Sequence, residues 1–430
     1  HVCKTGELMK KYGITGKEYK RPKIKKPIHK MGAAAEFDPN QCINCNKCVQ
    51  ICEKIGIGFL KLKGKAAKTE LAYTDDKCVD CIYCGQCTVS CPVAAVREQD
   101  HIEKVEKALK DKNKIVIVQM APSIRCSIGE EFGLKPGVNL MEQCYTALRL
   151  LGFDKIFDVN MGADITTVVE AEELIERIEK NGPLPMFTSC CPGWVKCAEF
   201  YYPEILPNLT TARSPQIHSG ACYKTYWAEK EKIDPKKIVV VSVMPCTSKK
   251  YEAQLEKLFV NGLRPVDHVI TTREFASMLK ERKIDLPKLK KGKVDKYGTF
   301  SGAAAIYGAS GGVMESALRT VQHLLTGKDL PKIEFKAVRG MKGLKKAEVN
   351  INGTKLRVAV AATPANVKII LEELKKNPKA YHYVEVMSCP GGCIGGGGQP
   401  IPSTERIISE RIEGLYRIDD KMKLRRAHNN

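Results

Sequence analysis

The sequence predicts a cysteine-rich α+β domain followed by a larger α/β domain with mostly parallel sheets. Residues 36–98 are dense in cysteine and short on helical periodicity, whereas from about Lys112 apolar strands alternate with amphipathic helices. Such alternation is typical of layered α/β folds. A length of 430 residues with 43% hydrophobic content allows two or three domains. We therefore expect a basic N-terminal arm over residues 1–35, the cysteine-rich domain over 36–98 and the α/β domain over 99–430.

Short apolar runs and longer helical repeats place the elements of the α/β part. The expected strands cover residues 114–120, 155–160, 185–187, 236–244, 355–361 and 381–387. The expected helices cover residues 141–153, 164–181, 311–327 and 365–377. Glycine at both ends of the stretch 311–327 marks where that helix begins and ends.

The chain is strongly basic, with a formal net charge of +21. We interpret its lysine-rich runs as solvated loops, or as a surface that attracts an acidic electron-transfer partner. A nucleic-acid surface is less well supported, because no binding motif accompanies the runs. No apolar stretch approaches the roughly 18 residues of a membrane span. The cysteine spacing favours metal clusters in a reducing, cytoplasmic setting over disulfides, although the chain opens at His1 and a preceding targeting segment stays open.

Two cysteine ladders in the first domain carry the spacing of bacterial ferredoxins. The run Cys-x2-Cys-x2-Cys-x3-Cys occurs twice, and only the second run is followed by proline. This spacing holds two [4Fe–4S] cubanes, and the fourth cysteine of each run ligates the other cluster. One cubane would take Cys42, Cys45, Cys48 and Cys91, and the other Cys81, Cys84, Cys87 and Cys52. Zinc is the alternative, which tandem eight-cysteine runs disfavour. Cys78 breaks the pattern, either as a spare thiol or as a competing ligand.

Five further cysteines follow predicted buried strands in the second domain. Open α/β sheets bind ligands beyond the carboxyl ends of their strands, so these thiols can converge on one buried site. They are Cys190, Cys191, Cys246, Cys389 and Cys393. A cubane needs four thiolates, and one thiol is therefore in surplus.

The stretches "TSCCPGW", "MPCTSKKYE" and "VMSCPGGCIGGGGQP" resemble the signature motifs of the iron-iron ([FeFe]) hydrogenases. The resemblance extends from about Gln41 to the C-terminus and implies an H-cluster domain built of two α/β lobes. The H-cluster is a [4Fe–4S] cubane joined through a cysteine sulfur to a two-iron unit with CO, cyanide and an azadithiolate. By motif match the cubane ligands are Cys191, Cys246, Cys389 and Cys393. Cys393 would bridge to the two-iron unit, and Cys190 would stay free to pass protons.

The same resemblance implies a proton path and a set of pocket residues. Glu170, Glu173 and Arg177 lie on one face of a predicted helix, which alone would indicate only a solvated face. The family's path uses these positions and a hydroxyl that maps to Thr210. The residues expected around the two-iron unit are Pro122, Ser123, Gln216, Met244, Lys249 and Met387. Lys249 would offer a charge-assisted hydrogen bond to an anionic ligand, and the methionines would supply polarizable walls.

The resemblance implies a reversible hydrogenase that interconverts protons, electrons and dihydrogen. No G-x-G-x-x-G motif indicates a nicotinamide or flavin site, so we expect electrons from another protein. Candidates are ferredoxin, or an iron–sulfur subunit of a formate dehydrogenase or an NADH-oxidising complex; dedicated maturases would assemble the H-cluster. The alternatives are a hydrogen sensor, an iron–sulfur scaffold without turnover, and a plain polyferredoxin subunit. Neither Cys3 nor Cys126 follows a spacing that assigns it a role.

Overall fold

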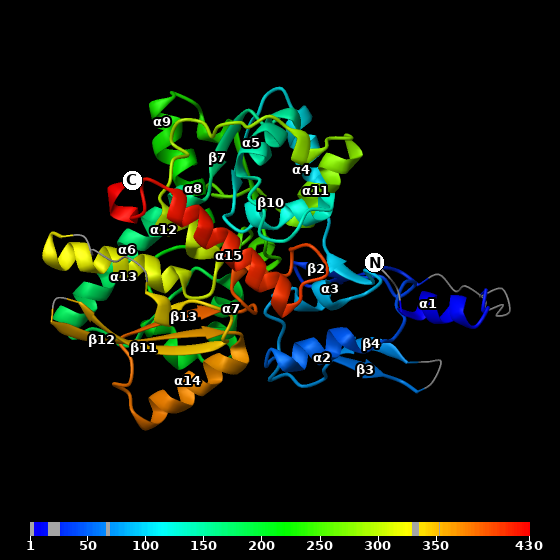
Figure 1. The fold of residues 1–430 in the computed structure, drawn as a ribbon, viewed down its shortest axis with the longest axis horizontal. Helices are drawn as coiled ribbons and strands as arrows, with labels where there is room; N and C mark the ends of the chain where they lie inside the picture. The colour runs from blue at the N-terminus through cyan, green and yellow to red at the C-terminus, as the bar shows by residue number, and fades with distance from the viewer. Residues whose placement is uncertain (1–3, 16–25, 66–68, 329–334, 352) are drawn as a thin grey trace.

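The computed structural model describes residues 4–15, 26–65, 69–328, 335–351 and 353–430. The basic stretch expected in the N-terminal arm lies largely outside these residues, as does Cys3. Helix α1 (Lys4–Lys11) belongs to the described part of the arm. Figure 1 shows it at one edge of the molecule, next to the elements of the cysteine-rich unit.

The cysteine-rich unit is an α+β assembly of ferredoxin type, as predicted. Strands β1 (His29–Met31), β2 (Ala35–Phe37) and β5 (Val96–Glu98) form one antiparallel sheet, so the end of the expected arm contributes a strand. The hairpin β3 (Leu60–Lys63) and β4 (Glu70–Tyr73) forms a second sheet. The short helices α2 (Lys47–Lys54) and α3 (Gln86–Ser90) each begin inside a cysteine ladder and pack against each other.

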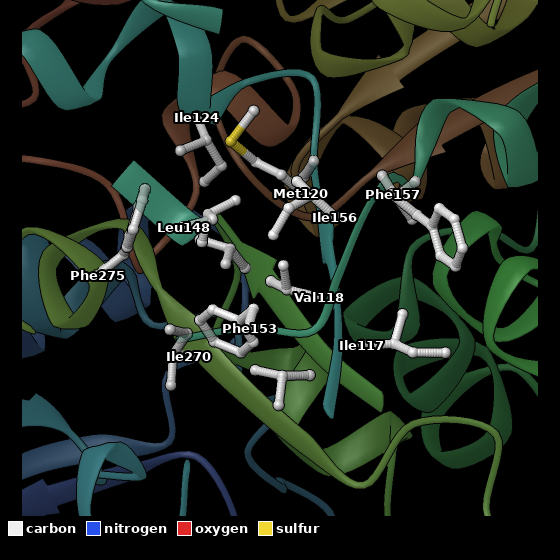
Figure 2. Packing of buried hydrophobic residues seen from close by; sticks show 14 of the residues in the cluster. Ile117, Val118, Met120, Ile124, Leu148, Phe153, Ile156, Phe157, Ile270 and Phe275 are labelled. Atoms are coloured by element: carbon white, nitrogen blue, oxygen red, sulfur yellow. The ribbon is translucent and has the colours of Figure 1, made fainter. Parts of the chain in front are cut away.

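The first sheet of the large domain is wholly parallel. Its strands β6 (Ile115–Met120), β7 (Lys155–Asp158), β9 (Ile238–Met244) and β10 (His268–Thr271) stand in the order β10-β9-β6-β7. Val116, Ile117 and Val118 are at most 2% exposed, because helices cover both faces of the sheet. Figure 2 shows this packing, with Phe153, Ile270 and Phe275 among the side chains that fill the core.

The helices around this sheet include α5 (Met141–Leu150), which was predicted, and α11 (Thr272–Glu281), which was not. Helix α11 starts with a capping box, in which the Thr271 side chain accepts from the Glu274 amide and Glu274 accepts from the Thr271 amide. Such reciprocal bonds satisfy two amides at the start of the helix.

The second sheet has the order β11-β12-β13-β8, from β11 (Leu344–Ile351), β12 (Thr354–Ala362), β13 (Tyr383–Met387) and β8 (Met186–Phe187). Only the pairing of β11 with β12 is antiparallel. The expectation of two α/β lobes with mostly parallel sheets is therefore confirmed. The predicted helices α13 (Gly312–Thr326) and α14 (Pro364–Lys376) accompany this sheet.

Long helices join the two lobes. Helix α6 (Asn160–Glu179) packs against α8 (Pro215–Cys222) from the first lobe and against α13 from the second. The C-terminal helix α15 (Glu405–Lys421) packs on α12 (Gly302–Ala305) and runs across the face between the lobes in Figure 1. Within the described ranges, no helix has the length and apolar content needed to cross a membrane.

Candidate active site

A buried cavity of about 60 Å³ lies where the strands of the two sheets end. Its walls come from the segments that follow β6, β7, β8, β9 and β13 and from the start of α8. The predicted pocket residues all line it, namely Pro122, Ser123, Gln216, Met244, Lys249 and Met387. Cys190, Cys246, Cys393 and Tyr307 line it as well. The crevice beyond the strand ends is thus where the sequence predicts it.

The five motif thiols of the second domain form one group around this cavity, and all of them are buried except Cys393, which is partly buried. Cys190 and Cys191 end the loop after β8, and Cys191 caps helix α7 (Pro192–Tyr201), which begins with proline. Trp194 of this helix donates its indole N–H to the Thr188 carbonyl, 3.0 Å away, and so fixes the loop. Cys246 follows β9, while Cys389 and Cys393 follow β13.

Electrostatic effects show that these thiols are close neighbours. Burial, and then the charge of Cys191, raises the pKa of Cys246 to about 11. Burial, and then the charges at Cys191 and Cys246, raises the pKa of Cys393 above its ordinary range. Burial, and then the charges of Cys84 and Cys246, also raises the pKa of Cys389. Buried thiols that crowd together in this way become stable thiolates when a metal binds them.

The thiol of Cys190 holds its proton more tightly than a free thiol does. A free cysteine thiol has a pKa of about 8.5. Burial, and then the charges of Glu170 and Cys393, raises the pKa of Cys190 well above that value. The residue is therefore held in its protonated form beside the cavity.

Lys249 is charged and held in place by a neighbour that the sequence analysis missed. Its Nζ donates to the Glu252 Oε2 at 2.9 Å and to the Cys190 carbonyl oxygen at 3.0 Å. Burial opposes the charge, but the Glu252 carboxylate raises the pKa of Lys249 above its usual value. The spacing from Lys249 to Glu252 is one helical turn, which was the available signal.

Glu252 also organises the start of α8. Its Oε2 accepts from Gln216 Nε2 at 2.7 Å and from the Ser214 hydroxyl at 2.9 Å. One carboxylate oxygen thus fixes side chains on two walls of the cavity.

Two orphaned polar atoms test whether the cavity fits a polar cofactor. Ser123 Oγ and Gln216 Oε1 are buried, lie on cavity-lining residues and have no hydrogen-bond partner among the residues that the structure describes. Buried polar atoms without partners are costly. The cavity offers a hydroxyl group, an amide oxygen acceptor and an ammonium group beside the thiols, and these polar groups fit the H-cluster.

The proposed proton path is connected at its outer end. Glu173 accepts from the Thr210 hydroxyl and from Arg177 Nη2, each at 2.6 Å. Thr211 adds hydrogen bonds from its amide and its hydroxyl. Burial opposes the charge, yet these hydrogen bonds lower the pKa of Glu173. Glu173 is therefore ionised in the protein.

The inner carboxyl of this path behaves differently. Glu170 is fully buried on α6, and burial raises its pKa to about 8. Its Oε2 accepts from the Tyr383 hydroxyl at 2.9 Å, whereas its Oε1 has no partner in the described part of the chain. Tyr383 was not predicted, because a tyrosine in a buried strand is its only signal in the sequence.

In the first domain the structure brings cysteines of the two ladders together in mixed groups. Cys42, Cys45, Cys48 and Cys91 line one small pocket. The other four are electrostatic neighbours, since Cys52 contributes to the raised pKa of Cys81, Cys84 and Cys87, in each case after burial. In the first group Cys45 is exposed. In the second group the Cys84 carbonyl oxygen lies 3.8 Å from the thiol of Cys389, which belongs to the group around the cavity. The second set therefore lies between the first set and the cavity.

The arrangement of thiols does not suit single metal ions. Among the described residues, no three side chains of histidine, cysteine, aspartate or glutamate come close enough to bind one ion. The cysteines of a cubane bind different irons and stand farther apart than the ligands of a single zinc. This spacing argues against the zinc alternative. Cys78 is exposed next to the second ladder, and Cys126 is buried against Gly414 of α15.

Thiols at the ends of two mostly parallel sheets, beside a ferredoxin-like unit, define an iron–sulfur oxidoreductase. Residues 114–397 match the family described as iron only hydrogenase large subunit, C-terminal domain, and residues 41–95 match the 4Fe-4S dicluster domain. The chain belongs to the iron-only, or [FeFe], hydrogenase family, as its motifs predicted. Its two domains accordingly carry two [4Fe–4S] clusters and an H-cluster.

The chain is similar to known hydrogenases and to an iron-sulfur assembly component. Iron hydrogenase 1 of Clostridium pasteurianum is 45% identical over 100% of this chain and 76% of its own length. A solved structure of [FeFe]-hydrogenase HydA1 from Chlamydomonas reinhardtii aligns with a TM-score of 0.68 and 39% identity, covering 77% of this chain and 92% of that one. Cytosolic iron-sulfur assembly component 3 of Mus musculus is 31% identical over 87% of this chain and 84% of its own.

Proposed function

We propose that this protein catalyses the reversible reduction of two protons by two electrons to dihydrogen. The observation that supports it best is the cavity, which brings all six predicted pocket residues together with Cys190, Cys246 and Cys393. The bound H-cluster would supply the metal at which dihydrogen is formed or split. Cys191, Cys246, Cys389 and Cys393 would hold it. Lys249 and Ser123 would donate hydrogen bonds to its outer ligands, and Gln216 would lie near them.

Protons would move along a route made of this chain's side chains. Cys190 would pass a proton between the cavity and Glu170. The two groups are neighbours, since the charge of Glu170 contributes to the raised pKa of Cys190. Glu170 would pass the proton toward Glu173, one helical turn away on α6. Thr210 and Arg177 hold Glu173 toward the surface side of this route.

Electrons would enter through the first domain, whereas protons would move through the second. The cubane held by Cys42, Cys45, Cys48 and Cys91 would accept them, since Cys45 is exposed. The cubane held by Cys52, Cys81, Cys84 and Cys87 would pass them on, because Cys84 contacts Cys389. The donor would be ferredoxin or an iron–sulfur subunit of a larger complex, in a reducing compartment such as the cytoplasm. The matched segments 41–95 and 114–397 fall inside the proposed domains 36–98 and 99–430.

The experiment is anaerobic dihydrogen evolution from reduced viologen, on protein co-expressed with the maturases. Wild type and Cys222→Ala should evolve dihydrogen, since Cys222 is a partly exposed thiol on α8 that does not line the cavity. Cys190→Ala should keep its clusters and lose nearly all turnover. Substantial turnover in Cys190→Ala would overturn the proton relay.

The similarity to an iron–sulfur assembly component supports a second candidate, a scaffold or sensor without significant turnover. The complete set of cavity residues speaks against it. Infrared bands of CO and cyanide in the matured protein, with no dihydrogen evolved, would favour it over the hydrogenase.

A further inference from the structure

Tyr383 makes the two oxygens of the Glu170 carboxyl inequivalent. Tyr383 is the first residue of β13 and is fully buried. Its hydroxyl donates to Glu170 Oε2 at 2.9 Å, and burial, then the charge of Glu170, raises the pKa of Tyr383 well above its ordinary value. The phenol therefore stays neutral and remains a donor. Oε1 of the same carboxyl is buried and has no hydrogen-bond partner within the described ranges of the chain.

Among the described residues, no cation contributes to the electrostatic environment of this carboxyl. The charges that affect Glu170 come from Glu385 on β13 and Glu173 on α6, and both oppose ionisation. Tyr307 and Cys190 face Glu170 from the cavity side and are neutral. Burial raises the pKa of both groups, and the charge of Glu170 raises it further. The hydrogen bond from Tyr383 is thus the interaction that favours the carboxylate.

We infer that Tyr383 is a positioning residue for proton transfer, which fixes Glu170 Oε2 as a hydrogen-bond acceptor and leaves Oε1 as the oxygen that takes up and releases the proton. The inference rests on the proposed function, because it deepens the role of Glu170 in that route. During dihydrogen oxidation the S–H bond of Cys190 breaks and an O–H bond forms at Oε1. The same proton then leaves Oε1 toward Glu173, and the reverse sequence serves dihydrogen evolution.

This assignment predicts a spectroscopic signature. When the proton is on Oε1, the carbonyl oxygen is Oε2, and Tyr383 donates to it. A hydrogen bond to a carbonyl oxygen lowers its stretching frequency, so Tyr383→Phe should raise the frequency of the Glu170 acid band. The variant should also raise the pH at which this band disappears by about one pH unit, because a hydrogen bond to a charged group is lost.

The control is Tyr381→Phe, two residues earlier in the chain. The Tyr381 hydroxyl donates to Glu373 on α14, away from the cavity. This variant removes the same atom from the same segment and should leave the Glu170 band unchanged. The band itself is identified as the one that Glu170→Gln abolishes.

The measurement is infrared titration of the matured protein and of protein that carries cubanes without the two-iron unit. The expected result is a higher frequency and a higher midpoint in Tyr383→Phe alone, together with a turnover profile displaced to higher pH in the matured enzyme. Loss of turnover in Glu170→Gln with an unchanged band in Tyr383→Phe would overturn this inference and leave the route standing. Full turnover in Glu170→Gln would overturn the route on which the inference depends.

Discussion

Lys249 and Glu252 form a buried ion pair on the wall of the cavity, with Nζ and Oε2 2.9 Å apart. The pair stands one helical turn apart on α10 (Ser248–Glu252). Because Gln216 and Ser214 donate to the same oxygen, the carboxylate also ties α10 to α8. The Lys249 ammonium group that lines the cavity is therefore held in place by the Glu252 carboxylate.

Neutralising Glu252 should destabilise the protein. Removing one partner of a buried pair leaves the other charge uncompensated, which costs about 3–5 kcal/mol. We expect Glu252→Gln to lower the free energy of unfolding by about 3 kcal/mol, read from urea unfolding under anaerobic conditions. Glu256→Gln is the matched control, because Glu256 is exposed just beyond the same helix. Equal unfolding midpoints in the two variants would contradict the role given to the pair.

The hydroxyl group of Thr210 should affect turnover more than its methyl group does. Thr210 donates to Glu173 Oε2 at 2.6 Å, and a hydrogen bond to a carboxylate contributes about 1.5–3 kcal/mol. We expect Thr210→Val to slow turnover by about tenfold or more. Thr210→Ser keeps the donor and should stay within about twofold of wild type. Steady-state dihydrogen evolution compares them, and equal rates for valine and serine would remove Thr210 from the route.

The direction of catalysis should depend on pH through Glu170. Burial raises the pKa of this carboxyl to about 8, so the acid form that delivers protons predominates below that pH. Dihydrogen evolution should therefore fall as the pH rises through about 8, whereas dihydrogen oxidation, which needs the carboxylate, should rise.

Film electrochemistry at constant driving force measures both directions. Glu172→Gln, at an exposed position on the same helix, should reproduce the wild-type profile. Glu170→Gln should lose most of its turnover at every pH. A wild-type profile in Glu170→Gln would show that another group sets the pH dependence.

The sequence predicted the parts of the site that spacing or strand ends determine. The ladder cysteines and the thiols after β8, β9 and β13 lie where a regular pattern puts them. Glu252 and Tyr383 escaped prediction, because their roles arise from contacts between segments far apart in the chain. Tyr383 reaches Glu170 across 213 positions, and no local periodicity encodes such a contact. Strand β11 was missed for a different reason, since it lies at the edge of the sheet and only Lys345 and Ile351 of its residues are buried.

The crossing of the two ladders yields the last prediction. Cys91 lines the pocket of Cys42, Cys45 and Cys48, although it closes the other run in the sequence. Cys91→Ser should therefore weaken or remove the outer cubane and leave the inner one intact, with a loss of about four irons per chain. Cys52→Ser should instead affect the cubane beside Cys389.

Iron content and electron paramagnetic resonance of the reduced protein distinguish the two variants. Two neighbouring reduced cubanes give a coupled spectrum, and the loss of either leaves the uncoupled signal of the other. In Cys91→Ser, reduction by an external protein donor should slow sharply, because the exposed acceptor is gone while the cavity is untouched. Cys78→Ser is the control, since this exposed thiol lies outside both groups and its loss should change neither iron content nor spectrum. Iron loss in Cys78→Ser would mean that Cys78 is a ligand and that the second group must be redrawn around it.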